Sequence, residues 1–474
     1  MEGGIIYSKK QQLMRTRAVE RFKFDLPIRI VLIYMSFIDP IHGRIRIPMW
    51  LNRILNHPLV RRTMFIRQLG LKAYIDFPGA IHTRFSHLIG TMYLAEKLCN
   101  VLINKLSKKE EGQEAKEVLQ ERKTDIVIAG FLHDIGHGPF SHAIDYALKR
   151  ILNQSHEELS SKLILEKFKE LEPHADLGKV ARIINGKYEY PFITKIINGP
   201  IDVDRLDFLV RDSYHVGLKY YFDIEHFIHK YTVIGLESQE ELKRLTLGLE
   251  YTEDDKTAVT TAEIFFVIWR GMYDLVYYKD RSRIAEKMLE YAVLNKAQKD
   301  PSFKDIFEDI DKFSNLYDES LLSRLEKGND FSSVIASRIK MGKLYEMVSK
   351  ANIFNFAKNI ECVNQLKGDP DDFSYKLTEK VCRELAYEFE ADVPPIICDV
   401  IPSKILKEEI SLSMVNEETG APLDLREVSD LLSGLQSRFE LRIYVDKERI
   451  KEGDRHDNFK KIKKTAQEII ENWQ

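Results

Sequence analysis

The sequence contains little cysteine and no long uninterrupted apolar run. Its 474 residues include only four cysteines, and these show no paired spacing: Cys99, Cys362, Cys382 and Cys398. Scattered cysteines exclude a disulfide scaffold or a zinc ribbon and indicate buried thiols in a reducing compartment. The longest apolar run near the start, residues 26–37, is interrupted by Arg29 and is too short to span a membrane. We therefore expect a cytoplasmic protein without a membrane partner.

An excess of charge of either sign is also missing. The chain has 71 lysines and arginines against 74 aspartates and glutamates, which gives a net charge of -3. A balance of this kind gives no indication of a nucleic-acid partner. Hydrophobic residues make up 44% of the chain, so its length allows a large core and more than one domain of average size.

Helical periodicity dominates from about residue 48 to residue 300. Apolar residues recur there at three- and four-residue spacing, which predicts helices in four segments: 89–106, 124–133, 140–152 and 284–297. The segment 108–123 alternates in charge without an apolar face and is expected to be a solvated helix or loop. Strand-like runs are short and come late, at residues 395–401, 410–415 and 441–445, with a turn near Gly420.

These patterns predict a mainly α protein in three parts. Residues 1–37 are interpreted as an N-terminal extension, for which a misassigned start before Met35 is the open alternative. Residues 38–345 are expected to form the helical core. Residues 346–474 are expected to form a small α+β lobe with a role in oligomerisation or regulation.

The most informative stretch is residues 132–142, with the sequence LHDIGHGPFSH. An apolar helix ends in the adjacent pair His133 and Asp134, and two glycines and a proline then interrupt the helical pattern. A new helix is expected near Phe140, with Pro139 at its first position. One His-Asp pair is weak evidence, because most such pairs are surface accidents. Three histidines close together around glycines, directly after a buried helix, favour a functional site over a purely structural cluster.

A metal site needs more ligands than this pair. His87 precedes an amphipathic helix, and Asp204 lies in the sequence IDVD, so the four residues would offer two imidazoles and two carboxylates. Such a set suits a divalent ion with water in its remaining positions: Mn, Fe, Ni, Zn or Mg. Spacing alone selects only His133 and Asp134.

Six motifs in a fixed order resemble one enzyme family. They are DPIHG at 39–43, QLG at 68–70, FPGA at 77–80, RFSH at 84–87, the histidine stretch at 133–142, and IDVD at 201–204 through Arg211-Asp212. This order closely resembles the HD-superfamily deoxynucleoside triphosphate triphosphohydrolases, which include bacterial dGTPase-like enzymes and the sterile-alpha-motif/HD-domain dNTPase. The resemblance covers about residues 38–300 and is weaker in the C-terminal lobe.

The resemblance implies an HD-domain helical core, one divalent metal ion and a nucleotide substrate. The implied reaction is hydrolysis of a deoxynucleoside triphosphate to deoxynucleoside and inorganic triphosphate, with water attacking the α-phosphate. The family also implies a homo-oligomer, either a dimer or a tetramer. The implied metal ligands are His87, His133, Asp134 and Asp204.

A second group implied by the resemblance is a catalytic row beside the α-phosphate: His137, His142, Asp145 and His156. His142 and Asp145 are three residues apart, so on a helix the carboxylate can orient and charge the imidazole. A protonated histidine can then neutralise phosphate or donate a proton to the leaving group. For His156 alone, a surface helix residue is the alternative.

The substrate-binding residues implied by the family are Gln68, Leu69, Arg84, Arg205, Phe208, Asp212 and Tyr277. Arg84 and Arg205 would contact phosphate, and Arg205 adds a fork of donors where the family often has lysine. Asp212 and Gln68 would meet the sugar 3′-hydroxyl, while Tyr277 would crowd the 2′ position and favour deoxyribose.

Several positions depart from the family pattern. Phe208 stands where the family usually has tyrosine, so one hydroxyl contact is lost. The family's phosphate-binding arginine falls on Trp269, and Arg270 is displaced by one residue, a swing of about 100° on a helix. These departures keep open an HD phosphohydrolase that acts on another ester, such as a nucleoside monophosphate or a ribonucleotide. A non-catalytic regulator that binds nucleotide or nucleic acid is the alternative from another class.

The positions that bind an activating guanine nucleotide in regulated relatives also differ. They are Asn56, Arg61 and Met64 in this sequence. Methionine cannot hydrogen-bond a guanine edge as arginine does. Activation by GTP through this pocket is therefore not expected, although Arg61 and Arg62 could still bind phosphate.

Overall fold

The structure is a computed structural model that describes residues 34–473, except for 221, 237–240, 253, 388–392, 403–411, 417–418, 420–421, 434–438 and 451–454. Residues 1–33 of the predicted extension lie outside this range. Strand β1 (Tyr34–Asp39) pairs antiparallel with β2 (Gly43–Pro48), and the side chains of Met35 and Phe37 pack against the main core. This hairpin therefore packs as part of the larger lobe.

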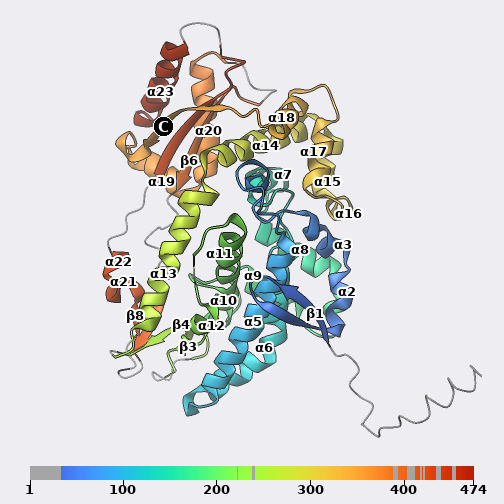
Figure 1. Ribbon diagram of the computed structural model, residues 1–474, viewed down its shortest axis with the longest axis vertical. Coiled ribbons are helices and arrows are strands. Elements are labelled where there is room, and N and C mark those ends of the chain that lie inside the picture. Colours follow the sequence, from blue (N-terminus) through green and yellow to red (C-terminus); the bar gives the residue numbers. More distant parts are fainter. Residues whose placement is uncertain are drawn as a thin grey trace, which may run out of the picture.

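Two long helices form the centre of the larger lobe. Helix α5 (Arg84–Leu106) packs along α6 (Gln113–Leu132), and α11 (Val203–Val216) packs against α5 (Figure 1). The predicted helix 89–106 is confirmed and begins five residues earlier. The charged segment 108–123 forms most of the first half of α6, because Ala115 and Leu119 supply a narrow buried face that the charge pattern conceals.

The remaining helices of the larger lobe come before, between and after these two helices. Before and between the long helices lie η1 (Met49–Leu51), α2 (Asn52–Leu55), α3 (Pro58–Arg62), η2 (Thr63–Phe65), α4 (Lys72–Ile75) and η3 (Glu110–Gly112). After α6 come η4 (Ser141–Ile144), α7 (Asp145–Leu152), α8 (His156–Lys167), η5 (Lys169–Leu171), α9 (Leu177–Ile184), α10 (Pro191–Ile197) and α12 (Ile224–Ile228). The lobe is completed by α13 (Thr257–Met272), the π-turn η6 (Tyr273–Tyr277), α14 (Asp280–Lys299), α15 (Pro301–Glu308), α16 (Ile310–Phe313), α17 (Asp318–Glu326) and α18 (Phe331–Lys340).

The helix expected from Phe140 begins later than predicted. Phe140 and Ser141 have left-handed backbone angles, φ 59° and φ 55°, so Pro139 does not start a helix. The N–H of Phe140 donates to the buried carboxylate of Asp318 at 2.6 Å, which holds the chain in a turn. A short 3-10 segment follows, and the α-helix starts at Asp145.

A separate apolar core holds the C-terminal lobe, at the top of Figure 1. Its antiparallel sheet has the order β5 (Glu346–Asn352), β9 (Phe439–Val445) and β6 (Ile396–Pro402), which confirms the predicted strands near 395–401 and 441–445. The helical elements of this lobe are η7 (Ile353–Asn355), α19 (Ile360–Gly368), α20 (Pro370–Glu384) and α23 (Arg455–Glu471). Arg283 of α14 joins the two lobes, because its Nε and Nη2 donate to both oxygens of Asp399 at 2.8 and 2.9 Å.

The strand predicted at 410–415 lies in the larger lobe instead of the C-terminal lobe. Its described part, β7 (Ser413–Asn416), pairs in parallel with β4 (Thr246–Tyr251) in a sheet of order β3 (Tyr231–Ile234), β4, β7 and β8 (Pro422–Asp424). Helices α21 (Leu425–Val428) and α22 (Asp430–Ser433) follow beside α13 (Figure 1). The predicted turn residue Gly420 lies outside the described residues.

The prediction of a mainly α protein is confirmed. Two further expectations concern the cysteines and the membrane. All four cysteines are buried and free, as their spacing predicts. Among the described helices, none combines the length and apolar character that crossing a membrane requires.

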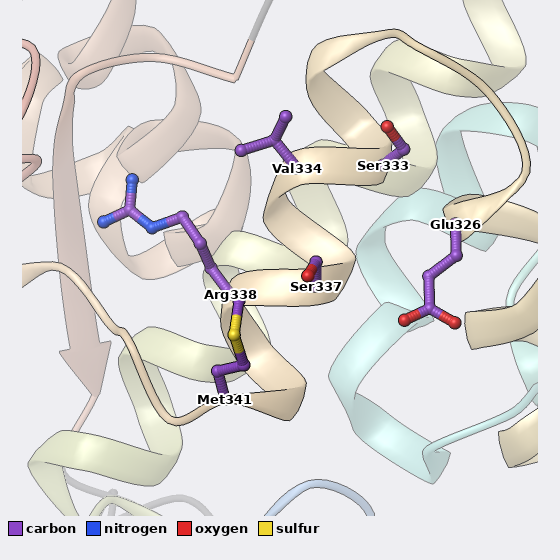
Figure 2. A pocket seen from close by; sticks show the side chains of 6 residues that line it. All are labelled: Glu326, Ser333, Val334, Ser337, Arg338 and Met341. Atoms are coloured by element: carbon purple, nitrogen blue, oxygen red, sulfur yellow. The ribbon is translucent and has the colours of Figure 1, made fainter.

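A surface hollow of about 390 Å³ lies along α18 (Figure 2). It is lined by Glu326, Ser333, Val334, Ser337, Arg338 and Met341. The guanidinium of Arg338 is held by Asp446 at 2.8 Å, and no histidine or cysteine lines the hollow. It therefore offers none of the chemistry expected from the histidine-rich stretch.

Candidate functional site

The four residues implied as metal ligands meet at one point. His87 lies in the first turn of α5, His133 and Asp134 directly follow α6, and Asp204 lies in the first turn of α11. Helix α11 begins there because Asp202 caps it, accepting the N–H of Arg205 at 2.8 Å. Possible ligand atoms of His87, His133 and Asp134 all lie within 4.8 Å of one another.

The distances within this group match those of atoms that share one ion. The Oδ1 atom of Asp204 lies 3.0 Å from His87 Nε2 and 3.4 Å from His133 Nε2. Asp134 contributes distances of 3.4 Å to His133 Nε2 and 3.6 Å to His87 Nε2. Bonds of about 2.1 Å at right angles would separate neighbouring ligand atoms by about 3.0 Å. The group therefore has the size of an octahedral or tetrahedral divalent-ion site.

Hydrogen bonds orient both imidazoles for metal binding. His87 Nδ1 lies 2.7 Å from Asp207 Oδ2, and His133 Nδ1 lies 2.9 Å from the carbonyl oxygen of Gly130. With the proton on Nδ1, each ring directs the lone pair of Nε2 towards the other ligands. Both Nε2 atoms are buried and have no well-formed hydrogen bond. These orphaned atoms, beside two carboxylates, fit a bound cation.

The charges at the site favour a cation as well. Burial would raise the pKa of Asp204, yet His133 and His87 hold it well below its usual range. Burial would also raise the pKa of Asp134, but the charges of Arg84 and His133 lower it by more and hold it well below its usual range. Both carboxylates are consequently ionised at neutral pH.

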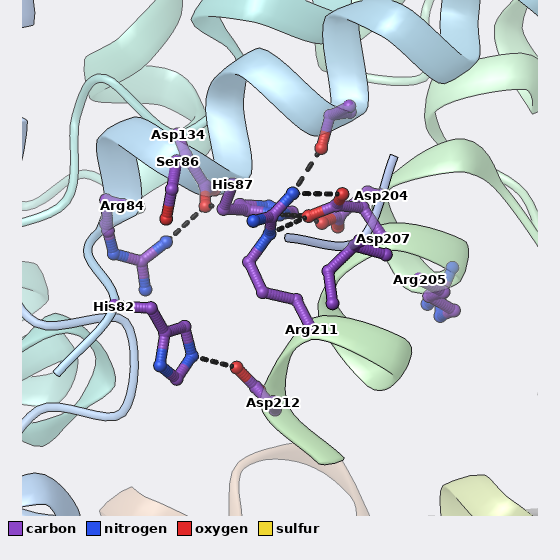
Figure 3. A network of polar contacts seen from close by, with 12 residues as sticks. His82, Arg84, Ser86, His87, Asp134, Asp204, Arg205, Asp207, Arg211 and Asp212 are labelled. Atoms are coloured by element: carbon purple, nitrogen blue, oxygen red, sulfur yellow. Dashed lines mark hydrogen bonds and ion pairs between the residues drawn. The ribbon is translucent and has the colours of Figure 1, made fainter. Parts of the chain in front are cut away.

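Asp207 is a fully buried residue that the sequence analysis missed. Its carboxylate receives Arg211 Nε and Nη2, both at 2.8 Å, and lies 2.6 Å from His42 Nε2 (Figure 3). Arg211 also donates to Asp39 at 2.7 Å, so the β1–β2 hairpin is tied to α11. The DPIHG and Arg211-Asp212 motifs contained these residues, but no spacing rule connects His42 with a carboxylate 165 positions away.

Gly90 allows α5 to approach this buried ion pair. An added Cβ at Gly90 would lie 1.9 Å from Asp207 Oδ1 and 2.4 Å from Arg211 Nη2. We expect Gly90→Ala to lower the free energy of unfolding by about 3 kcal/mol, because it must displace a buried and paired charge. Urea unfolding followed by circular dichroism measures this change.

Gly368→Ala is the matched control for that substitution. Gly368 also lies in a helix, as the last residue of α19, but no atom lies within 4 Å of an added Cβ there. Its unfolding midpoint should stay at or slightly above that of the wild type. Equal midpoints for the two variants would mean that the close approach at Gly90 is not needed.

The three histidines of the predicted catalytic row surround its one carboxylate, Asp145. Asp145 lies 2.7 Å from His142 Nδ1, 3.3 Å from His137 Nδ1 and 3.4 Å from His156 Nδ1. The rings of His137 and His156 stack with centroids 3.8 Å apart. His142 is 66% exposed and the others are largely buried, so it is the histidine most open to an incoming ligand.

The charges in this row favour a protonated imidazole at His156, whereas desolvation lowers the pKa of His142 to about 4. Burial would raise the pKa of Asp145, but His137, His156 and His142 hold it well below its usual range. Burial also opposes the charged form of His156, yet Asp145 and Glu157 raise its pKa to about 9. The row therefore suits an anion. It lies next to the proposed metal ligands, since His137 Nε2 is 3.3 Å from Asp134.

The predicted sugar contacts are grouped around Asp212. Its two oxygens lie 2.7 Å from the Tyr277 hydroxyl, which donates, and 2.6 Å from His82 Nε2. Gln68 is linked to this group, because its N–H donates to the carbonyl of His82 at 3.1 Å. The Phe208 ring lies between, 6.3 Å from Tyr277 and 6.4 Å from His87, and Leu69 is buried beside Gln68.

The two predicted phosphate-binding arginines differ in their environment. Arg84 is buried and pairs with Asp134, and its Nη2 has no hydrogen-bond partner. Arg205 instead donates from Nη1 to Gly199 O and to Asp202 at 2.7 Å, and Figure 3 shows it turned away from the group around His87. Arg84 is thus placed at the metal cluster, while Arg205 would have to release Asp202 to reach it with Nη1.

Trp269 and Arg270 take the directions that their helix positions predict. Trp269 is buried and lies 5.5 Å beneath the Arg205 guanidinium. Arg270 is half-exposed and pairs with Asp274 at 3.6 Å. The one-residue displacement therefore moves this cation out of the site.

The position of Arg62 corrects one expectation at the activator positions. Arg62 is buried, and its guanidinium donates to the carbonyls of Ile135 at 2.8 Å, His137 at 2.6 Å and Leu316 at 3.1 Å. It is not placed to bind phosphate, because it is buried and its Nη2 holds the backbone of the histidine stretch. Arg61 and Asn56 are exposed, and Met64 is half-buried.

Unsatisfied polar atoms gather at this site. Ten buried side-chain nitrogen or oxygen atoms among the described residues lack a hydrogen-bond partner. Six of the ten belong to the proposed metal ligands, the histidine row and the residues beside them: Gln68 Oε1, His82 Nδ1, Arg84 Nη2, and the Nε2 atoms of His87, His133 and His137. Buried polar groups are normally paired, so a cluster of unpaired ones indicates a place that binds a ligand.

Comparison with known proteins matches two family models to this chain. The model described as HD domain matches residues 84–211, and the one described as HD associated region matches residues 243–469. An uncharacterised protein from Methanocaldococcus jannaschii is 28% identical over 441 residues, which cover 91% of this chain and 83% of that protein. A phosphohydrolase structure from Bacteroides thetaiotaomicron superposes with a TM-score of 0.65 and 23% identity, covering 87% of this chain and 100% of the other.

An enzyme of named activity is also similar. The deoxynucleoside triphosphate triphosphohydrolase SAMHD1 of Homo sapiens is 25% identical over 430 residues, which cover 81% of this chain. The match spans only 62% of the human protein's own length. The matched HD domain contains His87, His133, Asp134 and Asp204, and the HD associated region follows it, so this chain carries an HD domain together with its associated region.

Proposed function

We propose that this protein hydrolyses deoxynucleoside triphosphates to deoxynucleoside and inorganic triphosphate with the help of one divalent ion. The observation that carries the proposal is the group of six unpaired buried polar atoms in one site. They comprise donors for an anion, nitrogen ligands for a cation and contacts for a sugar, which together match a metal-bound nucleotide. The named activity of the human relative supports the same substrate class.

His87, His133, Asp134 and Asp204 would hold the ion. The geometry fits, because both imidazoles direct their Nε2 atoms towards two ionised carboxylates. When bound, a divalent ion supplies a Lewis acid for phosphate and lowers the pKa of the attacking water. The identity of the ion is open among Mn, Fe, Ni, Zn and Mg, since all accept mixed nitrogen and oxygen ligands.

The histidine row would handle the charge and the proton of the reaction. Water adds to the α-phosphorus, the bond from phosphorus to the 5′-oxygen breaks, and this oxygen takes up a proton. His142 would donate this proton in our proposal, because its side chain is exposed and its Nδ1 is held by Asp145. Desolvation lowers the pKa of His142 to about 4 in the free protein, and the negative charge of a bound phosphate would raise it again. His137 and His156 would neutralise phosphate oxygens, and Arg84 Nη2 would add a further donor.

Asp212 and Gln68 would bind the sugar 3′-hydroxyl, and Tyr277 would close the space at the 2′ position. Tyr277 is fixed by its hydrogen bond to Asp212, so its ring cannot easily yield to an extra hydroxyl. Phe208 and Leu69 would add apolar contact to the nucleotide. Arg205 could contact phosphate only after giving up part of its bonding to Gly199 and Asp202.

Removing and restoring metal across a panel of substrates tests this function. Protein stripped with a chelator and reloaded with Mn, Mg, Ni or Co should hydrolyse at least one deoxynucleoside triphosphate, and not before reloading. Preferred turnover of monophosphates or ribonucleotides would support the alternative ester substrate, which the outward direction of Arg270 keeps open. No turnover of any nucleotide would contradict both. The expected dimer or tetramer stays a prediction that light scattering would test.

Substitution of Tyr277 tests the sugar assignment. We expect Tyr277→Ala to raise turnover of ribonucleotides relative to deoxyribonucleotides by about tenfold or more, because the ring no longer crowds the 2′-hydroxyl. Tyr277→Phe is the control, since it keeps the ring and loses only the bond to Asp212. Ratios of kcat/KM measure the effect, and an unchanged ratio in the alanine variant would remove Tyr277 from sugar selection.

A further inference from the structure

The turn that follows the histidine stretch is held in an unfavourable conformation. Phe140 and Ser141 have φ angles of 59° and 55°, which side chains other than glycine rarely adopt. The turn also packs closely on Gly70, where an added Cβ would lie 2.2 Å from the carbonyl oxygen of Phe140. Strained backbone persists only where its surroundings enforce it, and it is concentrated at functional sites.

One carboxylate from a distant helix enforces this turn. Asp318, at the start of α17, is fully buried and accepts the N–H of Phe140 at 2.6 Å with one oxygen. Its second oxygen accepts the N–H of Arg67 at 2.9 Å. Asp318 therefore clamps the turn against the segment before the QLG motif.

The clamped turn is connected to the metal cluster through two side chains. The Ser141 hydroxyl donates to the carbonyl of Arg67 at 2.6 Å and accepts from Arg84 Nε at 2.9 Å. The same guanidinium pairs with Asp134 through Nη1. A continuous path of buried contacts thus runs from Asp318 through Ser141 and Arg84 to a proposed metal ligand.

A purely local role for Asp318 does not account for its contacts. Acidic residues in the first turn of a helix are common, because they complement the helix dipole. Both oxygens of Asp318, however, bond to N–H groups outside α17, on chain segments 178 and 251 residues away. The carboxylate of Asp318 therefore stabilises the turn at Phe140 and Ser141.

We propose that Asp318 is a positioning residue for the metal site: by holding the Phe140–Ser141 turn, it fixes Arg84 and thereby the carboxylate of Asp134. Only the catalytic consequence of this inference rests on the proposed function. Because Asp318 touches neither a proposed ligand nor substrate, it acts entirely through Ser141 and Arg84.

Asp318→Asn tests the proposal through metal affinity, without any nucleotide. The amide keeps the shape but places an NH2 group against one of the two N–H donors, so the turn must move. We expect the dissociation constant for Mn²⁺, measured by titration with electron paramagnetic resonance, to rise about tenfold, the lower end of the range for groups outside the first ligand shell. Asp318→Glu keeps the charge on a longer side chain and is the second variant, for use if Asp318→Asn does not fold. We expect it to raise the dissociation constant for Mn²⁺ by a similar factor.

Thr378→Val is the matched control. Thr378 also clamps backbone from a buried position, since its hydroxyl accepts the N–H of Cys398 at 2.9 Å, but it lies in the C-terminal lobe. It should lose stability in urea while binding Mn²⁺ like the wild type. Equal Mn²⁺ affinity for Asp318→Asn, Thr378→Val and the wild type would overturn the proposal.

A double-mutant cycle tests the path itself. Ser141→Ala breaks the link between the turn and Arg84, so we expect the double variant with Asp318→Asn to bind Mn²⁺ about as weakly as the weaker single variant. Multiplied effects would mean that Asp318 and Ser141 act independently and would overturn the relay. A wild type that binds Mn²⁺ but hydrolyses no nucleotide would contradict the proposed function and leave this inference intact.

Discussion

Asp134→Ala is expected to remove the divalent ion and with it all detectable hydrolysis. Asp134 lies 3.4 Å from His133 Nε2 and 3.6 Å from His87 Nε2, and its loss would leave Asp204 as the only carboxylate among the four proposed ligands. The substitution also leaves the buried guanidinium of Arg84 without its partner beside the site. An unpaired buried cation repels a second one, which adds to the loss of the ligand. Elemental analysis of the purified variant measures the bound metal, and His133→Ala should behave in the same way.

Asp125→Asn is the control for the loss of metal. Asp125 is a buried aspartate in α6, the helix that ends just before His133 and Asp134. It accepts the N–H of Asp176 and pairs with Arg122, and it is not one of the proposed metal ligands. This variant should retain the metal content of the wild type. Stoichiometric metal in Asp134→Ala or His133→Ala would refute the ligand assignment.

His142→Ala is expected to keep the metal and to lower kcat by about 10²- to 10⁴-fold, the range for a residue that transfers a proton. His142 does not belong to the metal cluster, and its Nδ1 lies 2.7 Å from Asp145. Removing it leaves His137 and His156 on the same carboxylate, so phosphate binding should suffer less than turnover. Steady-state kinetics together with elemental analysis separates the two effects.

His226→Ala controls for the removal of an exposed imidazole. His226 lies on α12 and is exposed, but no contact connects it with the row around Asp145. Its turnover should equal that of the wild type. Unchanged turnover in His142→Ala would remove His142 from the mechanism, and loss of its metal would place it among the ligands.

Much of the helical fold was predictable, because long amphipathic segments carry a strong periodic signal. The apolar spacing in residues 89–106 and 284–297 predicted α5 and α14 with small errors at their ends. The start of α7 was not predictable from spacing. It depends on Asp318, which captures the N–H of Phe140 from 178 residues away and holds the turn open.

The position of β7 shows a second limit of sequence patterns. The apolar run near 410–415 predicts a strand but not its partner, since pairing depends on contacts between distant segments. In the structure β7 pairs with β4, so this part of the chain returns from the C-terminal lobe to the larger one.

At the site, the motifs predicted the residues that converge better than the residues that hold them in place. His87, His133, Asp134 and Asp204 converge as the resemblance implied. Asp207 was missed although it orients His87, because one more aspartate on an acidic helix gives no distinguishing signal. The sequence suggested that Arg62 could bind phosphate. In the structure it donates to backbone carbonyls instead, and no sequence pattern distinguishes a buried arginine of this kind from an exposed one.

Hydrolysis of a deoxynucleoside triphosphate in water enriched in ¹⁸O, with the products identified by mass spectrometry, tests the proposed reaction. We expect an unlabelled deoxynucleoside and an inorganic triphosphate that carries one ¹⁸O, because water attacks the α-phosphorus and the bond to the 5′-oxygen breaks. Release of pyrophosphate or orthophosphate, or ¹⁸O in the deoxynucleoside, would contradict it.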